Sequence, residues 1–344
     1  MIDKKVKILQ VIDRLSVGGA EQITVLLTNL LFKGDYDVSL LLLMDKGELF
    51  DELDDQIPII ELSKKSNLDF KTYYKCYKII KNYDVIHVHM RHNYKFIRVV
   101  KVLFGLKAKV ILHDHFGSIE TDKSIPTFFK VFKPRYYIGV SKSLIQWALS
   151  FGVKNSFLLQ NTISKKKTIP SKIKVGGFVN VANIKPIKNQ LFALELAHFL
   201  EERITFYGNI QDKAYYEVLI NKVNELKMND KVRFIHNNSQ IQSELNQYDA
   251  ALHTALSESG PLVLIEYLAQ EIPFLSYKTG EVARFLENEL PESIISNFEL
   301  NLWKEQMEKV KKEDLSSLGE LYNKFFSPEN YFKSCLNIYK NVIN

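Results

Sequence analysis

The chain has little cysteine and no long hydrophobic run. Its 344 residues include two cysteines, Cys76 and Cys335, which give neither a disulfide framework nor the spacing of a metal site. The longest purely apolar stretches, such as Leu40 to Met44, are far too short to span a bilayer. The first residues lead into a short strand rather than the apolar core of a signal peptide. We therefore expect a cytoplasmic protein.

The composition is that of a soluble globular protein, with 46% hydrophobic and 25% charged residues, and the length allows two domains. Charge is distributed unevenly, with a net charge of +10 for residues 1–168 and −4 for residues 169–344. The basic half contains two stretches in which aromatic and basic residues alternate, Tyr73 to Lys81 and Phe128 to Tyr137. Such stretches favour docking on an anionic membrane, although a solvated helix face above core aromatics fits the pattern as well.

Strand-like and helix-like patterns alternate along the whole chain. In the first half, strands are predicted over residues 6–12, 38–44, 57–61, 85–89, 109–113, 136–140 and 157–160, and helices over 21–32, 70–81, 94–104, 126–132 and 142–150. In the second half, strands are predicted over residues 177–182, 204–207, 232–235, 250–253 and 274–276. The alternation predicts an α/β fold with two parallel sheets, and the lysine-rich residues 165–172 indicate a linker between them. Ligands are expected where the strands end.

The segment from Ser257 to Glu266 predicts a ligand site. Glu258 and Glu266 lie eight positions apart around a Gly260-Pro261 turn that opens an apolar helix. Proline suits the first helical position and glycine permits close backbone approach, so the free amides of the first turn can face an anion. A cap at Glu258 and a solvated Glu266 would explain the pair alone equally well.

Two further turns follow predicted strands. Gly18 and Gly19 follow the first strand, where glycine lets the backbone approach a phosphate, although the pattern is not GxGxxG. In the second half, Lys188 stands at the start of a helix predicted over residues 189–199, where an ammonium would neutralise a diphosphate. Each feature alone also fits a simpler explanation: the glycines could merely form a turn, and Lys188 could be an ordinary surface lysine.

The histidines form two pairs at strand ends, His87 with His89 and His113 with His115. Strand alternation places both members of a pair on one face, as a zinc site would require. Strand-end packing, a sugar contact from His113 and metal binding all remain open. Asp35-Tyr36-Asp37 mimics a metal motif, but a turn is expected there because it joins a helix to an apolar strand.

Taken together, the chain resembles glycosyltransferase family 4, the retaining sugar-nucleotide transferases with the GT-B fold. The strongest likeness is between Glu258 to Glu266 and the E-x7-E signature of that family, followed by the Gly18 to Glu21 loop. Similar motifs occur at residues 140–143, 160–162, 206–209, 232–234, 280–283 and 329–339. The resemblance implies two Rossmann-like domains facing each other across a cleft. An acceptor-binding domain would span residues 1–168 and a nucleotide-sugar-binding domain residues 169–325, with a terminal helix over 326–344 that crosses back to the first domain.

The resemblance also implies the roles of individual residues. Glu266 would hold the ribose hydroxyls, Glu258 the donor sugar, Lys188 the diphosphate, and His113 would position the sugar. The catalytic candidates are therefore His113, Lys188 and Glu258, with no metal site. The donor-binding candidates are Gly18, Gly19, Asn183, Lys188, Gly208, Glu258, Ser259, Gly260, Pro261, Leu262 and Glu266. Asn183 departs from the family, which usually has arginine there, and Lys185 could compensate.

The function implied is metal-independent, front-face retaining transfer from a nucleoside diphosphate sugar, namely a UDP-sugar, to a lipid-linked or other cell-surface glycan. No cofactor is expected beyond this donor. The expected partners are the donor, a glycan or polyprenyl-linked acceptor and an anionic membrane, with no nucleic acid. The protein would then be peripheral on the inner face of the membrane. Two alternatives remain, a metal-dependent hydrolase built on His87, His89, His113 and His115, and a non-catalytic sugar-nucleotide-binding relative.

Overall fold

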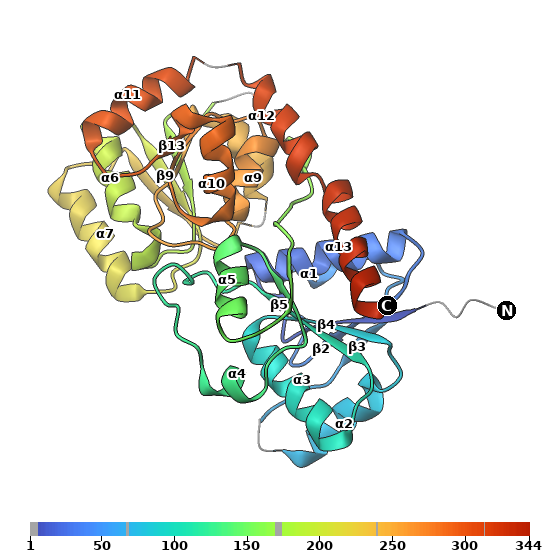
Figure 1. Cartoon of the computed structure of the whole chain (residues 1–344). Helices are drawn as coiled ribbons and strands as arrows, with labels where there is room; N and C mark the ends of the chain where they lie inside the picture. Colours follow the sequence, from blue (N-terminus) through green and yellow to red (C-terminus); the bar gives the residue numbers. More distant parts are fainter. Residues whose placement is uncertain (1–5, 67–68, 169–173, 239, 313) are drawn as a thin grey trace. The chain divides into compact units, whose positions relative to one another are not determined.

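The computed structural model describes residues 6–66, 69–168, 174–238, 240–312 and 314–344. The chain divides into two compact units, each with its own parallel sheet (Figure 1). Unit 1 comprises Met1–Ile163 and Pro328–Asn344, and unit 2 comprises Ser164–Ser327. The last helix of the chain therefore belongs to the first unit, although it follows the second in sequence.

Unit 1 contains a seven-stranded sheet in the order β3-β2-β1-β4-β5-β6-β7. Its strands are β1 (Lys7–Ile12), β2 (Asp37–Leu42), β3 (Ile59–Glu61), β4 (Val85–His89), β5 (Lys109–Asp114), β6 (Tyr136–Gly139) and β7 (Asn155–Leu158). Its helices are α1 (Gly19–Lys33), α2 (Phe70–Ile80), α3 (Arg91–Phe104), α4 (Thr127–Val131), α5 (Lys142–Ser150) and α13 (Pro328–Ile343). The central strands read as continuous apolar runs because helices cover both faces of the sheet.

Unit 2 contains a six-stranded sheet in the order β10-β9-β8-β11-β12-β13. Its strands are β8 (Phe178–Val181), β9 (Ile204–Tyr207), β10 (Val232–Ile235), β11 (Ala250–His253), β12 (Phe274–Tyr277) and β13 (Ile294–Ile295). Its helices are α6 (Gln190–Phe199), α7 (Lys213–Glu225), α8 (Ile241–Glu244), α9 (Leu262–Ala269), α10 (Gly280–Glu289), α11 (Leu300–Val310) and α12 (Ser316–Leu321). The strand order reverses between β8 and β11, so the loops that leave these two strands diverge, and in open α/β sheets ligands bind at such a point.

Two parallel sheets were predicted, and both are present. Two departures are that α3 begins at Arg91 rather than Tyr94 and that the short strand β13 was not predicted. Polar residues open α3, so apolar periodicity could not find its first turn. Pro261 precedes α9 as its N-cap, and Lys188 lies in a 3-10 turn (Pro186–Lys188) rather than in α6. The proposed linker extends beyond the described residues, which resume at residue 174.

None of the described helices is long and apolar enough to cross a membrane.

Candidate functional site

Lys188 and Glu258 meet at the carboxyl edge of the unit 2 sheet. Lys188 follows β8 and Glu258 follows β11, the two strands between which the order reverses. The Lys188 ammonium forms an ion pair with Oε1 of Glu258, and the two side chains are only 18% and 15% exposed. The sequence-predicted diphosphate lysine and sugar carboxylate are therefore in direct contact, in the position where ligands bind to open α/β sheets.

Backbone contacts fix both loops. Thr254 Oγ1 donates to the carbonyls of Lys188 and Asn189 at 3.2 and 3.0 Å, which ties the lysine turn to the end of β11. The Glu258 N–H donates to Thr279 Oγ1 at 3.1 Å. Gly280 has φ +79°, and a Cβ there would lie 2.7 Å from Cδ of Pro261. Glycine is needed at 280 because the start of α10 packs directly on the Glu258 loop.

His253, at the end of β11, completes this cluster. Its Nε2 lies 3.7 Å from Oε1 of Glu258, which is close enough for an electrostatic effect but too long for a hydrogen bond. Ser276 Oγ donates to the Tyr277 carbonyl and is 2.9 Å from His253 Nδ1. The hydroxyl has one proton, so it accepts from Nδ1–H, and the neutral ring presents an unprotonated Nε2 beside Glu258.

The charges of the cluster follow from burial and from the ion pair. Burial alone would raise the pKa of Glu258, but the charge of Lys188 outweighs it and lowers this pKa to about 2. Burial lowers the pKa of His253. Near neutral pH the site therefore presents one carboxylate, one neutral imidazole and one ammonium. Glu258 is a hydrogen-bond acceptor under these conditions and cannot act as a proton donor.

A second lysine lies near the pair. Burial and the charge of Lys188 both lower the pKa of Lys185, whereas Glu258 raises it. Asn183, which stands where the resemblance calls for arginine, has its side chain engaged elsewhere, since its Oδ1 accepts from the Asn209 N–H at 3.0 Å. A Cβ on Gly208 would lie 2.2 Å from the Ala182 carbonyl oxygen. Gly208 is thus required by backbone packing between the loops after β8 and β9.

Glu266 lies on α9, half-buried, with different neighbours from Glu258. Burial raises its pKa to about 7, while Lys166 and the Gln242 side chain oppose that rise. Gln242 also accepts from the Lys166 N–H at 2.5 Å and from Gln270 Nε2 at 3.1 Å. Glu266 therefore sits where a small change in its surroundings decides whether it is charged near neutral pH.

Gly18, which together with Gly19 follows β1, lies beside a protein carboxylate. A Cβ on Gly18 would lie 2.4 Å from Glu21 Oε2, so the Glu21 carboxylate folds back over the start of α1. Burial raises the pKa of Glu21 to about 6, and its own backbone N–H partly offsets this. The helix start therefore faces a protein carboxylate in this structure.

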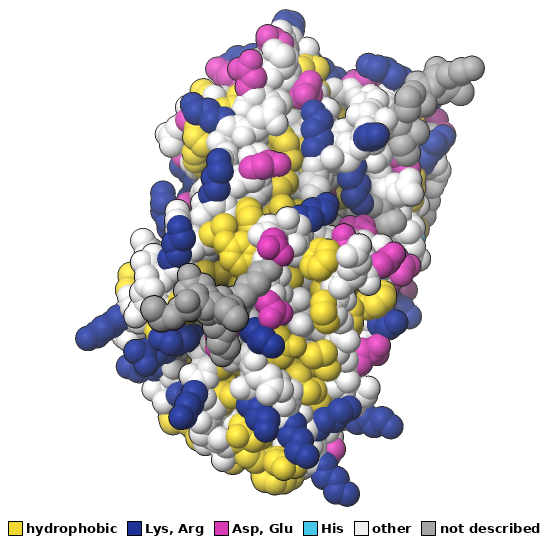
Figure 2. All heavy atoms as spheres, turned by 90° about the vertical axis from the view of Figure 1, so that its right-hand side faces the viewer, with side chains coloured by type: hydrophobic (Ala, Val, Ile, Leu, Met, Phe, Trp, Pro, Cys, Tyr) yellow, Lys and Arg dark blue, Asp and Glu magenta, His cyan; other side chains and the backbone are white. Residues whose placement is uncertain are grey.

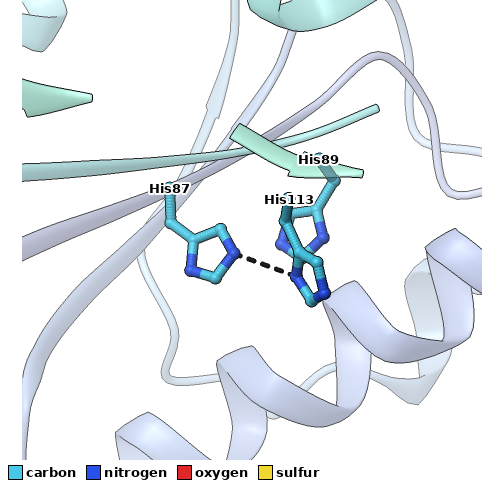
Figure 3. Close-up of side chains that lie close together, drawn as sticks. All are labelled: His87, His89 and His113. Carbon is cyan, nitrogen blue, oxygen red and sulfur yellow. Dashed lines mark hydrogen bonds between the residues drawn. The ribbon is translucent and has the colours of Figure 1, made fainter. Parts of the chain in front are cut away.

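The four strand-end histidines lie close together, whereas strand alternation predicted only that the two members of each pair share a face. His89 pairs with His113 in the parallel register of β4 and β5, and ring centroids are 4.7 Å apart in the His87–His89 pair and 4.1 Å in the His113–His115 pair. His87, His89 and His113 each place one nitrogen within 4.8 Å of the others (Figure 3). However, both ring nitrogens of His87 and of His89 already have hydrogen-bond partners.

Sequence reasoning missed His253, Ser276, Thr279 and Gln242. His253 had a signal, because it is a polar residue at the end of a predicted strand and five residues before Glu258. His253 is a single histidine and does not belong to either of the two pairs at strand ends. Gln242 lies on the short helix α8 and carried no signal, since its contact with the Glu266 region depends on how α8 packs.

Comparisons with known proteins concern the fold and the family. Residues 160–325 match the family described as "Glycosyl transferases group 1", a range that contains Lys188, Glu258 and Glu266. No curated protein matches the sequence. Among solved structures, Anabaena HepE in complex with UDP is similar with a TM-score of 0.80 and 16% identity, over 98% of this chain and 100% of that one.

Two further structures are similar over almost the whole chain. TarM of S. aureus has a TM-score of 0.78 and 12% identity, and the lipopolysaccharide outer core galactosyltransferase WaaB has 0.71 and 15%. Each match covers 98% of this chain and 99% of the other. The fold is therefore GT-B, and the group 1 domain on that fold supports a glycosyltransferase. The hydrolase alternative is not favoured, because the family match is to transferases and the His87 and His89 nitrogens are already bonded.

Proposed function

We propose that the protein is a retaining glycosyltransferase of the family 4 type, which moves a hexosyl group from a nucleoside diphosphate sugar to a glycan acceptor. The observation that carries the proposal is the buried cluster of Lys188, Glu258 and His253 at the strand-order reversal of unit 2. The cluster combines a fixed cation with two hydrogen-bond acceptors. A sugar diphosphate offers the complementary groups, an anion beside several hydroxyl donors.

The diphosphate is assigned to Lys188, supported by Lys185 and by the free amides at the start of α9. Cleavage of the bond between the sugar and the diphosphate leaves negative charge on the departing oxygen, which a preorganised ammonium stabilises. In a front-face reaction this oxygen accepts the proton of the acceptor hydroxyl while that hydroxyl attacks the anomeric carbon. Glu258 stays ionised at neutral pH, so it fits a role in holding sugar hydroxyls together with His253 Nε2.

UDP is the nucleotide that the comparisons favour, since HepE was solved with UDP, with UDP and glucose, and with UDP-glucose. We assign the ribose to Glu266, whose carboxylate can accept from two neighbouring hydroxyls. The remaining donor contacts of unit 2 are assigned to Ser259, Gly260, Pro261 and Leu262 around the α9 start. Gly18, Gly19 and His113 belong to unit 1, and their donor contacts stay predictions.

Calorimetric titration with UDP tests this assignment. The carboxylate form of Glu266 is the form that accepts ribose hydroxyls, and its pKa is about 7 in the free protein. UDP should therefore bind more tightly at pH 8 than at pH 6, by up to about tenfold. In Glu266→Gln that pH dependence should disappear, and affinity at pH 8 should fall by about 1.5 to 3 kcal/mol, the range for hydrogen bonds to charged groups.

Failure to bind any nucleoside diphosphate would overturn the proposed function. Binding without turnover of any UDP-sugar would instead indicate a non-catalytic relative. If Glu258→Ala abolishes UDP binding while Glu266→Gln leaves it intact, the roles of the two carboxylates are reversed.

The acceptor is proposed to be lipid-linked or at the cell surface, with the protein on the inner face of the membrane. Basic and apolar residues lie together on α2 and α3, where Phe70 is 62%, Tyr74 46% and Leu103 51% exposed. Figure 2 shows lysine and arginine side chains beside hydrophobic ones along the lower part of one face. The second basic-aromatic stretch differs, because Phe129 and Tyr137 are in the core. The α2–α3 surface is therefore our proposed membrane contact.

Co-sedimentation with liposomes tests the membrane contact. Replacing the exposed Lys71 and Lys78 by alanine should lower binding to anionic vesicles about 30-fold, because each lysine near such a surface contributes about 1 kcal/mol. The matched control replaces exposed Lys213 and Lys304 of unit 2, which should leave binding within about twofold. Equal binding to neutral and anionic vesicles would contradict the proposal, and water-soluble acceptors would then be favoured.

A further inference from the structure

Two buried glutamines of unit 2 hold residues 166–168 against α8 and α9. Gln270, the C-cap of α9, donates from Nε2 to the Lys166 carbonyl at 2.9 Å, and its Oε1 accepts from Thr168 Oγ1 at 3.0 Å. Gln242, on α8, accepts at Oε1 from the Lys166 N–H at 2.5 Å and from Gln270 Nε2 at 3.1 Å. Gln242 is 5% and Gln270 7% exposed. One buried network thus joins the segment to both helices.

These contacts fix the orientation of both amides. The Lys166 carbonyl can only accept, so the Gln270 atom beside it is the NH₂ group. The Lys166 N–H can only donate, so the Gln242 atom beside it is the oxygen. This oxygen accepts two hydrogen bonds, which occupy both of its lone pairs, and a flipped amide would set an NH₂ group against two donors. The Nε2 group of Gln242 is therefore left to bind a different acceptor.

That acceptor is the carboxylate of Glu266. Glu266 lies on α9 one turn before Gln270, whose N–H donates to the Glu266 carbonyl. Burial raises the pKa of the Glu266 carboxyl to about 7, and the charge of Lys166 and a side-chain hydrogen bond with Gln242 oppose this rise. Because Oε1 of Gln242 is occupied, its Nε2–H donates this bond. A donor to the charged form lowers a pKa, so the orientation of the amide and the direction of the effect agree.

Two ionisable groups lie close to the Glu266 carboxylate. Tyr267 is the next residue on α9, and burial raises the pKa of its phenol well above the ordinary value, so it stays neutral. Lys166 belongs to the segment that Gln242 holds, and its charge favours the ionised form of Glu266. Gln242 therefore acts on Glu266 directly through its amide, and indirectly by holding the backbone that carries the Lys166 ammonium.

Holding the segment in place is an incomplete account of Gln242. That role needs only the Oε1 atom, and a glutamate at position 242 would perform it equally well. It gives no reason for an N–H donor beside a carboxylate. A glutamate at this position would instead place two carboxylates next to each other, where both cannot easily be ionised.

We propose that Gln242 is a positioning residue for the nucleotide site: its amide, oriented by the backbone of Lys166, donates to Glu266 and directs the free lone pairs of that carboxylate to the ribose hydroxyls. The inference rests on the proposed function for the ribose, whereas the contact between Gln242 and Glu266 does not depend on it. A carboxylate has about four acceptor positions on two oxygens, so one bond from the protein fixes its rotation and leaves room for two neighbouring hydroxyls.

The titration of Glu266 can be measured without any nucleotide. Carbon NMR spectra of the full chain with labelled glutamate follow each carboxyl group, and Glu266→Gln assigns the signal. In Gln242→Met the pKa of Glu266 should rise by about one unit, the equivalent of one hydrogen bond to a charged group. In Gln242→Glu, which keeps the acceptor for Lys166, it should rise by at least about as much. An unchanged titration in both variants would overturn the proposal.

The matched control is Gln270→Met. It removes the hydrogen bonds to the Lys166 carbonyl and to Gln242 Oε1, while the Lys166 N–H still orients Gln242. This variant should lower the melting temperature and leave the Glu266 titration unchanged. An upward shift equal to that of Gln242→Met would show that Gln242 acts by holding the segment alone, and the proposed donor would be refuted.

Calorimetric titration with UDP connects the contact to binding. A rise of about one unit lowers the ionised fraction of Glu266 at pH 7 about fivefold, so UDP should bind Gln242→Met about fivefold more weakly at this pH. At pH 9 the carboxyl is mostly ionised in both proteins, and the loss should shrink to less than about twofold. An equal loss at both pH values would overturn the role through Glu266. If the wild type binds no nucleoside diphosphate, the proposed function fails, while the NMR titration still decides whether Gln242 donates to Glu266.

Discussion

Lys188→Ala is expected to lower kcat about 10²- to 10³-fold, because the ammonium stabilises charge that grows on the leaving diphosphate as the glycosidic bond breaks. The loss corresponds to about 2.7 to 4 kcal/mol, by analogy with removal of one oxyanion donor. Steady-state rates with a UDP-sugar measure it. KM should change less than kcat, since the interaction is strongest in the transition state.

Two controls separate this effect from misfolding. Lys188→Ala leaves the carboxylate of Glu258 without its partner, so Lys188→Ala with Glu258→Gln removes both charges and should restore the melting temperature but not the rate. Asn183→Ala should cost much less in kcat, because its side chain holds the Asn209 amide and offers little to an anion. Normal turnover by folded Lys188→Ala would place the diphosphate elsewhere and remove the basis of the mechanism.

Unit 1 is expected to lose stability steeply below neutral pH. The folded-state pKa values of His87 and His115 are lowered to about 3, and those of His89 and His113 are also lowered, mainly by burial. Their folded pKa values lie below the unfolded value of 6.5, so the unfolded state binds more protons once the pH falls. The contribution of these rings to the free energy of unfolding is fully present above about pH 6.5 and is lost as the pH falls toward 3. At pH 5 the loss is about 2 kcal/mol for each ring that stays neutral in the folded state.

Urea unfolding at pH 7 and pH 5 measures this loss. Trp147 lies in unit 1 and Trp303 in unit 2, so Trp147 fluorescence in a Trp303→Phe background follows unit 1. His115→Gln keeps a donor toward His89 but does not titrate, and it should reduce the difference between the two pH values by about 2 kcal/mol. The same difference in both proteins would show that His115 is protonated in the folded state.

Much of the fold followed from local pattern. The strands from β1 to β12 were located because buried parallel strands are continuous apolar runs, and the helices between them because one face is apolar. The bounds of the elements and the shortest strand were harder to predict. The first turn of α3 is polar, so it carries no periodicity, and β13 has only two residues. Length and local propensity cannot detect elements that exist only because a neighbouring strand pairs with them.

The sequence by itself determined the residue types and the loops of the candidate site: Glu258 and Glu266 around a Gly-Pro turn, Lys188 after the first strand of the second sheet, and histidines at strand ends. Lys188 and Glu258 follow strands and the histidines lie at strand ends, so local pattern was enough to place these residues at a sheet edge. Only the tertiary structure decided what these side chains do to one another. The ion pair of Lys188 with Glu258 spans 70 residues of sequence and lowers the carboxyl pKa, and the bond from Tyr339 to His87 spans 252. Charge state and tautomer depend on burial and on partners a few ångströms away, and chain folding alone brings those partners together.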